Sequence, residues 1–110
     1  MSKEQILQTI LNSIGDSVWV LTTLYKQNKG VGKEQLRGLV NERYGAKHEG
    51  KILITSRHIL DRYLSRLEGA GLVDVSEHGR ARHYHLSELG HELINFRKNI
   101  FIERKKPYGK

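Results

Sequence analysis

A segment in the middle of the chain carries hydrogen-bond donors that share one side of a predicted helix. Leu60 is taken as facing inward, and each residue turns the helix by about 100°. The opposite side and its flanks then present hydroxyl, imidazole and guanidinium groups, which belong to Ser56, Arg57, His58, Arg62, Ser65 and Arg66. A guanidinium can donate to two acceptors of one guanine, and a hydroxyl can bond a base edge or a phosphate oxygen. This spacing therefore predicts a helix that lies in the major groove of duplex DNA, with Ser56 and Arg57 placed at its start for phosphates.

Two more arginines lie at a predicted turn between two strands. His78 and Gly79 precede Arg80, and Arg82 follows in the returning strand. An arginine at the tip of a hairpin can enter a minor groove or pair with the flanking phosphates. We expect Arg80 to reach farther than Arg82, because the tip extends beyond the strand.

Both groups of charges also have a simpler interpretation. Charged residues on an amphipathic helix most often form a solvated face. Charges along a hairpin keep an exposed edge strand from pairing with other chains. On the helix alone the two interpretations are evenly balanced, and the hairpin that follows it favours DNA.

Apolar residues recur at helical spacing in four stretches of the first two thirds of the chain. They predict helices over Lys3–Ile14, from Asp16 or Ser17 as cap to about Asn28, over Lys33–Tyr44, and over Ser56–Gly69. Lys29–Gly32 reads as a turn, and Gly45 is placed to end the third helix in the left-handed conformation. Ala46–Thr55 stays open between a short strand and the entry to the next helix.

The pattern changes period after Gly71. Leu72–Ser76 alternates as a strand does, and Arg82–Leu86 is its returning partner across a turn at Glu77–Arg80. Ser87 is placed to cap a last helix that runs to about Arg104. The predicted order is four helices, a hairpin and a fifth helix.

This order is typical of a winged helix-turn-helix, a mainly α (α+β) fold with a two-stranded wing. Leu64–Val73 (LSRLEGAGLV) resembles the end of the recognition helix, its glycine cap and the first wing strand of bacterial and archaeal regulators. Gly79–Gly90 (GRARHYHLSELG) resembles the wing and following helix of the PadR and MarR families. The resemblance implies a transcriptional regulator that binds double-stranded DNA, with a recognition helix over about 56–69 and a wing over about 77–82.

The helix before the recognition helix crosses the DNA backbone in such folds. Lys33 and Arg37 lie on that predicted helix. We expect both side chains to touch phosphates.

The terminal helices exceed what a winged helix needs. In the resembled families such helices pair across a two-fold axis and place two recognition helices in successive major grooves. The resemblance therefore implies a homodimer through the N- and C-terminal helices. The alternative is that they pack on one another within one chain.

Length and charge fit a small nucleic-acid-binding domain. The 110 residues suffice for a single domain, expected over 1–104 with a core over about 17–90, followed by a basic flexible tail over 105–110. The net charge is +7, and six basic residues against one acid from Arg97 onward account for most of it. Such a tail, including Lys105 and Lys106, would add attraction that does not depend on DNA sequence.

Histidines raise a metal hypothesis that the sequence does not favour. His83 and His85 share one strand face, with His78 or His91 nearby. A site would need one or two further ligands, and the chain has no cysteine and no clustered carboxylate there. We expect solvent-facing histidines, with no metal and no cofactor.

Motifs of catalysis, secretion and membrane insertion are absent from the sequence. It has no phosphate-binding glycine loop, nucleophile elbow or zinc-protease motif, and Gly30–Lys33 lacks the strand and spacing of a phosphate loop. No apolar run approaches the ~20 residues of a spanning helix. The expectation is a cytoplasmic, nucleoid-associated protein that is not an enzyme and does not bind a membrane, with no effector ligand identified.

Two other functions stay open at this point. A winged helix can serve as a protein-interaction subunit of a larger complex, which predicts little affinity for a duplex. A sequence-nonspecific architectural or RNA-binding protein would depend mainly on the basic tail, and its binding would survive scrambling of the DNA sequence.

Overall fold

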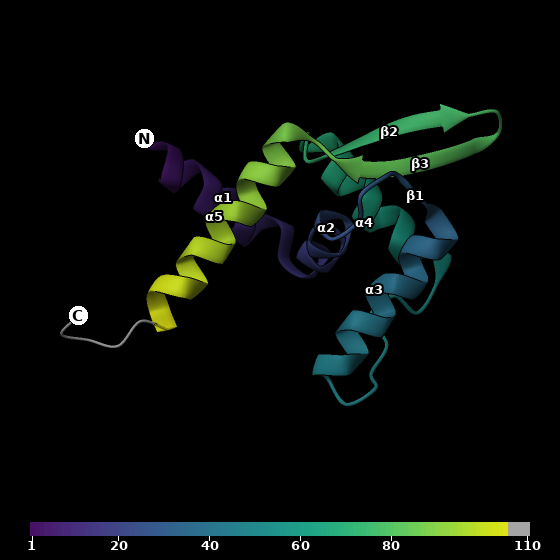
Figure 1. Cartoon of the computed structure of the whole chain (residues 1–110), viewed down its shortest axis with the longest axis horizontal. Coiled ribbons are helices and arrows are strands. Elements are labelled where there is room, and N and C mark those ends of the chain that lie inside the picture. The colour runs from purple at the N-terminus through teal and green to yellow at the C-terminus, as the bar shows by residue number, and fades with distance from the viewer. Residues whose placement is uncertain (106–110) are drawn as a thin grey trace.

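The structure, a computed structural model, describes residues 1–105 and shows five α-helices and a small sheet (Figure 1). The elements are α1 (Lys3–Ile14), a short 3₁₀ turn η1 (Gly15–Ser17), α2 (Val18–Tyr25), β1 (Val31–Gly32), α3 (Lys33–Lys47), α4 (Arg57–Gly69), β2 (Val73–His78), β3 (Ala81–Leu86) and α5 (Glu88–Lys105). None of these helices is both long enough and apolar enough to cross a membrane. The predicted tail beyond Lys105 lies outside the described residues, and α5 extends to Lys105 itself.

Helix α1 begins and ends where its apolar spacing predicts. The Ser2 hydroxyl accepts from the backbone N–H of Gln5, and the Gln5 side chain accepts from the backbone N–H of Ser2, which together cap the helix. Leu7 and Ile14 are buried, and α1 packs against α5. The two terminal helices therefore contact each other within one chain, and Lys3 reaches Glu92 of α5 at 3.3 Å.

The second helix begins as predicted, with Ser17 at its N-cap position, but it ends earlier than predicted. The buried Ser17 hydroxyl donates to the carbonyl of Ile14 and makes no cap hydrogen bond to α2. At the other end, α2 stops at Tyr25 and not near Asn28 because the N–H groups of Lys26 and Gln27 turn back to carbonyls three residues earlier. Because α2 ends early, the residues that follow it can reach the sheet and form β1.

A third strand replaces part of the predicted turn over Lys29–Gly32. β1 pairs antiparallel with β3, with Val31 opposite Tyr84, and the strand order is β1-β3-β2. Two residues are too few to show an alternating pattern, so this strand could not be predicted from hydrophobic periodicity. The buried Val31 side chain ties the α2–α3 connection to the wing hairpin.

The predicted hairpin is present. β2 and β3 pair antiparallel with Val73 opposite Leu86 and Val75 opposite Tyr84, and Gly79 in the connecting turn has a φ of +67°. Val73, Tyr84 and Leu86 are buried on the face toward the core. The turn projects away from the helices at one end of the molecule (Figure 1).

Helix α3 runs past Gly45, contrary to expectation. Gly45 stays helical, and the chain leaves the helix through positive φ at Glu49 (54°) and Gly50 (80°). The N–H of Gly50 donates to the carbonyl of Gly45 at 2.8 Å. Gly45 lies close to the returning chain, because a Cβ there would stand 3.4 Å from the Lys51 carbonyl oxygen.

The open segment Ala46–Thr55 contains neither a strand nor the entry to α4. After α3 ends it is a loop, and the side chain of Asn41 holds it in place. The Asn41 amide donates to the Ile54 carbonyl at 3.0 Å and accepts from the Ile54 N–H at 2.8 Å. Ile54 is fully buried while Ile52 is 61% exposed. The two hydrogen bonds from Asn41 therefore hold Ile54 in the core just before α4 begins.

Ser87 joins α4, the sheet and α5. Its hydroxyl donates to the carbonyl of Gly71 at 2.6 Å and accepts from the N–H of Gly90 at 3.0 Å, which confirms the predicted cap. Its own N–H donates to the carbonyl of Leu72. Helix α4, the hairpin and α5 are therefore fixed relative to one another by one buried residue.

Candidate nucleic-acid interface

Helix α4 begins at a serine cap and buries one apolar stripe. The Ser56 backbone is extended, and its hydroxyl accepts from the N–H of Ile59 at 3.3 Å. Leu60, Leu64 and Leu67 are buried against the core. The stripe fixes the rotation of the helix about its axis.

The polar side of α4 is uncovered, as its sequence predicts. Arg57, His58, Arg62, Ser65 and Arg66 are all exposed, and Ser56 is half-buried. Arg62 and Arg66 form no ion pair with any of the described residues. Their guanidinium groups are available to acceptors outside the chain.

Two ion pairs hold the start of α4 against α3. The Lys33 ammonium lies 2.6 Å from Asp61, and the Arg57 guanidinium lies 3.3 Å from Glu34. The hydrogen bond from Lys33 lowers the pKa of Asp61, with smaller contributions from neighbouring charges. Lys33 is thus oriented toward α4, and the sequence reasoning that placed it on phosphates missed this partner, because the two residues are far apart in the chain.

Replacing Lys33 with glutamine is expected to raise the pKa of Asp61 toward its ordinary value. A carboxylate whose pKa is lowered in the folded state stabilises the fold at neutral pH, and this contribution is lost as the pH falls through the lowered pKa. The measurement is an NMR titration of the Asp61 carboxyl in both proteins. An unchanged midpoint in the variant would show that the pair does not form in solution.

The two wing arginines differ in their surroundings. Arg82 lies 3.6 Å from Glu68 of α4 and 3.9 Å from Glu77, with its guanidinium over the Tyr84 ring. Arg80 is exposed in the turn and has no ion pair among the described residues. Arg80 is therefore better placed for an external phosphate or groove, and Arg82 fastens the hairpin to α4.

Arg37 is the remaining predicted contact, and it lies on α3. Arg37 is half-buried on α3, the helix that the two ion pairs join to α4. The His78 and His83 rings are 5.0 Å apart on the outer face of the hairpin. Among the side chains that the structure describes, those of residues 1–100, no three His, Cys, Asp or Glu gather closely enough to hold a metal ion.

Known proteins of similar sequence and fold carry the name TubR. The chain is 34% identical over 101 residues to the DNA-binding protein TubR of Bacillus cereus, and the match covers 86% of this chain and 84% of that protein. No protein-family model matches the chain.

Solved TubR structures share the fold. A type III plasmid segregation TubR mutant has a TM-score of 0.66 at 20% identity, covering 93% of this chain and 95% of that one. TubR bound to 24 bp of tubC, from Bacillus thuringiensis serovar israelensis pBtoxis, has a TM-score of 0.60 at 21% identity, with 90% and 95% covered.

These matches support the winged-helix fold, and they do not test the narrower resemblance to PadR and MarR. The match to the Bacillus cereus protein covers most of both chains, and its sequence identity is high enough to show common descent. The chain belongs to the family of the DNA-binding protein TubR.

Proposed function

We propose that this protein binds double-stranded DNA sequence-specifically, with α4 in the major groove and the wing on the adjacent minor groove or backbone. The observation that carries the proposal is the uncovered polar face of α4 beside a projecting hairpin. A helix of this kind fits the major groove, where each base pair presents a distinct pattern of acceptors and donors. The DNA-binding name of the curated relative adds support.

The residues divide by task in this proposal. Arg62, Ser65 and Arg66 read base edges, together with His58. Ser56 and Arg57 position the helix on phosphates, as do Lys33 and Arg37 from α3. Arg80 serves the wing contact, with Arg82 holding the wing against α4.

The relatives suggest the biological setting. One structural relative is described as a type III plasmid segregation protein, and another is bound to tubC DNA. We place this chain in the same process, acting at DNA within the cytoplasm. The transcriptional role implied by PadR and MarR stays a prediction.

We also propose that the protein acts as a homodimer whose two chains meet through α1 and α5. Ile6 of α1 is 46% exposed, and Ile10 and Leu11 are only partly covered within one chain. Apolar side chains left on a helix surface are the usual material of a subunit interface. Mass measurement in solution is expected to give twice the chain mass, and a monomer at micromolar concentration would refute this part of the proposal.

A salt-titrated binding experiment tests the DNA proposal. A duplex is selected from a random pool by the purified protein, and its affinity is compared with that of a scrambled duplex. We expect the selected duplex to bind at least ~10³-fold more tightly at physiological salt, as specific DNA-binding proteins do. Equal affinities would favour the architectural alternative, and negligible affinity for both would favour the protein-interaction alternative.

A further inference from the structure

A cavity of about 200 Å³ lies between α2, α3 and α5, away from the face assigned to DNA. It is lined by Thr22, Tyr25, Lys26, Arg43, Ile94, Arg97 and Lys98. Four of these residues are cationic, and no acidic residue of the described chain lines the cavity. Charged groups drawn together in this way are normally accompanied by carboxylates.

The Arg43 guanidinium is held in the cavity by neutral groups. It donates to the hydroxyls of Thr22 and Thr23 at 2.8 and 3.0 Å, and it lies 5.8 Å from the centre of the Trp19 ring. Burial lowers the pKa of Arg43 first, and the charge of Arg97 lowers it further. These contacts fix the orientation of Arg43 and leave its charge unneutralised.

Tyr25 organises the opposite side of the cavity. The Lys98 ammonium lies 4.8 Å from the centre of its ring and donates to its hydroxyl at 3.4 Å. The Tyr25 hydroxyl in turn donates to the side chain of Asn95 at 2.9 Å. Lys98 is therefore positioned at the rim by an aromatic ring and not by an opposite charge.

The carboxyl end of α2 does not account for this cluster. A helix terminus carries roughly half an elementary charge, against the three charges of Lys26, Arg43 and Lys98, which form no ion pair among the described residues. The carbonyls of Thr23 and Leu24 also accept from the N–H groups of Lys26 and Gln27. Most of the charge of Lys26, Arg43 and Lys98 is left for an anion outside the chain.

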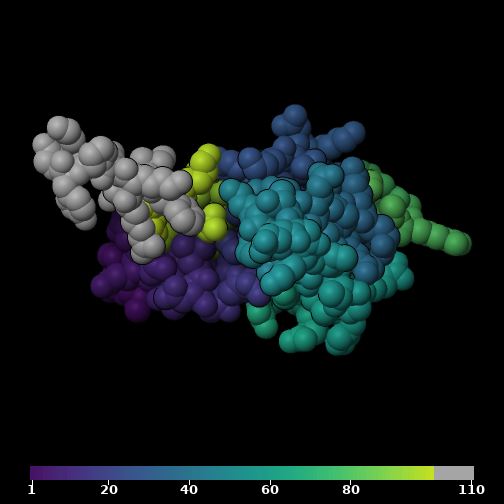
Figure 2. All heavy atoms as spheres, turned by 90° about the horizontal axis from the view of Figure 1, so that it is seen from below, coloured from purple at the N-terminus to yellow at the C-terminus, as the bar shows by residue number. Residues whose placement is uncertain are grey.

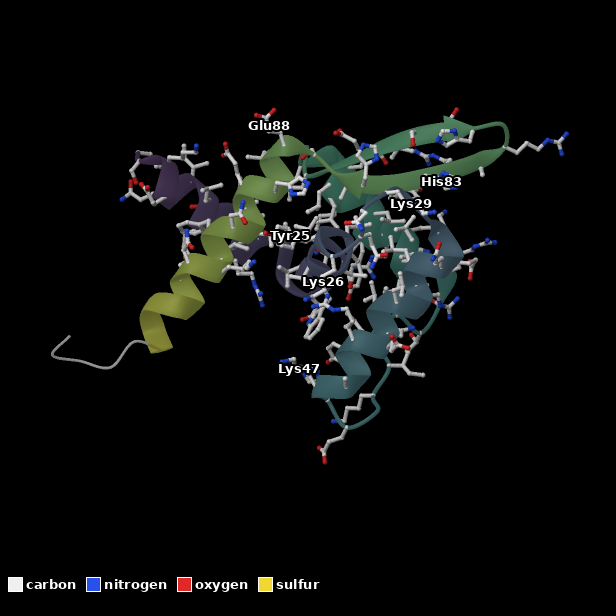
Figure 3. All side chains as sticks on the ribbon, viewed as in Figure 1. Tyr25, Lys26, Lys29, Lys47, His83 and Glu88 are labelled. Carbon is white, nitrogen blue, oxygen red and sulfur yellow. The ribbon has the colours of Figure 1, made fainter. Side chains whose placement is uncertain are left out.

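The cavity and α4 face different sides of the molecule. In the ribbon view, Tyr25 lies on the side of α2 toward α5, and α4 lies on the other side of α2 (Figures 1 and 3). Seen from below, the turn after α2 and helix α4 occupy opposite edges of the molecule (Figure 2). A ligand in the cavity would not collide with a duplex on α4.

We propose that this cavity binds the carboxylates of a flexible acidic protein segment. Guanidinium groups match carboxylates in geometry, and the buried Ile94 offers apolar surface for the methylenes of a glutamate. A flexible segment can place one side chain in so small a cavity, whereas a duplex is a stiff rod whose phosphates stay on its surface. The inference goes beyond the proposed DNA function and does not depend on it.

The probe is a fluorescein-labelled peptide of alternating glutamate and glycine, with glutamine in place of glutamate as the control peptide. The chain has one tryptophan, Trp19, next to Arg43, so its intrinsic fluorescence reports on the cavity. We expect the glutamate peptide to bind saturably and to change the emission of Trp19. The glutamine peptide should do neither. Binding is also expected to persist when the protein is saturated with the selected duplex.

Variants of the full chain locate the site. Lys26→Gln and Arg43→Gln are each expected to weaken the peptide about tenfold, as the loss of one charge-assisted contact does. Lys47→Gln removes an equal charge from an exposed position on α3 outside the cavity and should leave the affinity unchanged. Because Lys26 is exposed, its variant tests the proposal even if Arg43→Gln fails to fold.

Several results would overturn the proposal. Equal weakening by Lys47→Gln would mean attraction to net charge alone. Displacement of the peptide by duplex, together with weaker duplex binding by Lys26→Gln, would make the cavity a DNA contact. Arg62→Ala should weaken only the duplex, so failure of the peptide arm and failure of the DNA proposal are distinguishable.

Discussion

Replacing Arg62 with alanine is expected to weaken binding to the selected duplex by about 10- to 100-fold, since a good bidentate contact to a base contributes ~1–3 kcal/mol of discrimination. Arg62 stands on the exposed side of α4 with no ion pair among the described residues. Its loss should leave the fold intact and relax the sequence preference. Fluorescence anisotropy with selected and scrambled duplexes measures both effects.

Lys47→Ala is the matched control, because Lys47 is also exposed but lies at the far end of α3. It should weaken both duplexes slightly and to the same degree, as a general loss of positive charge does. The division of labour along α4 would be contradicted if Arg62→Ala reduced affinity for both duplexes equally.

Replacing Gly90 with alanine is expected to destabilise the fold by about 3 kcal/mol, which is at the upper end of overpacking effects. A Cβ at this position would overlap the Leu72 carbonyl oxygen, and it would stand 3.0 Å from the Leu86 side chain. Neither group can retreat easily, because the same carbonyl accepts from Ser87 at the junction of α4, the sheet and α5. The melting temperature should fall by roughly 12–24 °C.

Gly38→Ala provides the contrast within the same protein. Gly38 lies inside α3, and a Cβ there would meet nothing within 4 Å. Alanine in a helix interior is more favourable than glycine by ~0.5–1 kcal/mol, so this variant should melt at a higher temperature. Equal melting temperatures for Gly90→Ala and the parent protein, measured by circular dichroism, would show that the junction is looser than described.

Local patterns predicted the elements that bear on function. Helix α1 and helix α4 each have a serine cap and an apolar stripe within one continuous segment, so their bounds could be read from the chain. The wing also follows from alternation around Gly79, and Ser87 from its place before an apolar helical pattern. The cap hydrogen bonds of Ser2, Ser56 and Ser87 each join residues that are near in sequence.

Contacts between distant residues account for two of the errors, the end of α3 and the missed strand β1. Gly45 looked like a helix end, but the positive φ falls at Gly50 because the returning loop is held by Asn41 and Ile54. Strand β1 exists only because Val31 meets Tyr84, more than fifty residues later. Neither position carries a signal in its own neighbourhood.

In the candidate site, too, local features could be predicted from the sequence and contacts between helices could not. The exposed side of α4 follows from the burial of Leu60 and its spacing, and the structure places it as expected. The pairing of Lys33 with Asp61 depends on how α3 and α4 pack, which periodicity does not determine. The cationic cavity was missed for this reason also, since its residues come from three helices.

The central claim is that the polar face of α4 lies in the major groove of a DNA duplex. The chain has no cysteine, so a DNA-cleaving iron chelate can be attached at one chosen position, Ser65→Cys on α4 or Ser13→Cys on the exposed side of α1. Bound to the selected duplex, the protein labelled at position 65 should cut both strands within the recognised sequence, while the protein labelled at position 13 should cut weakly or elsewhere. Strong cutting from position 13 and none from position 65, with the duplex fully bound, would contradict the account.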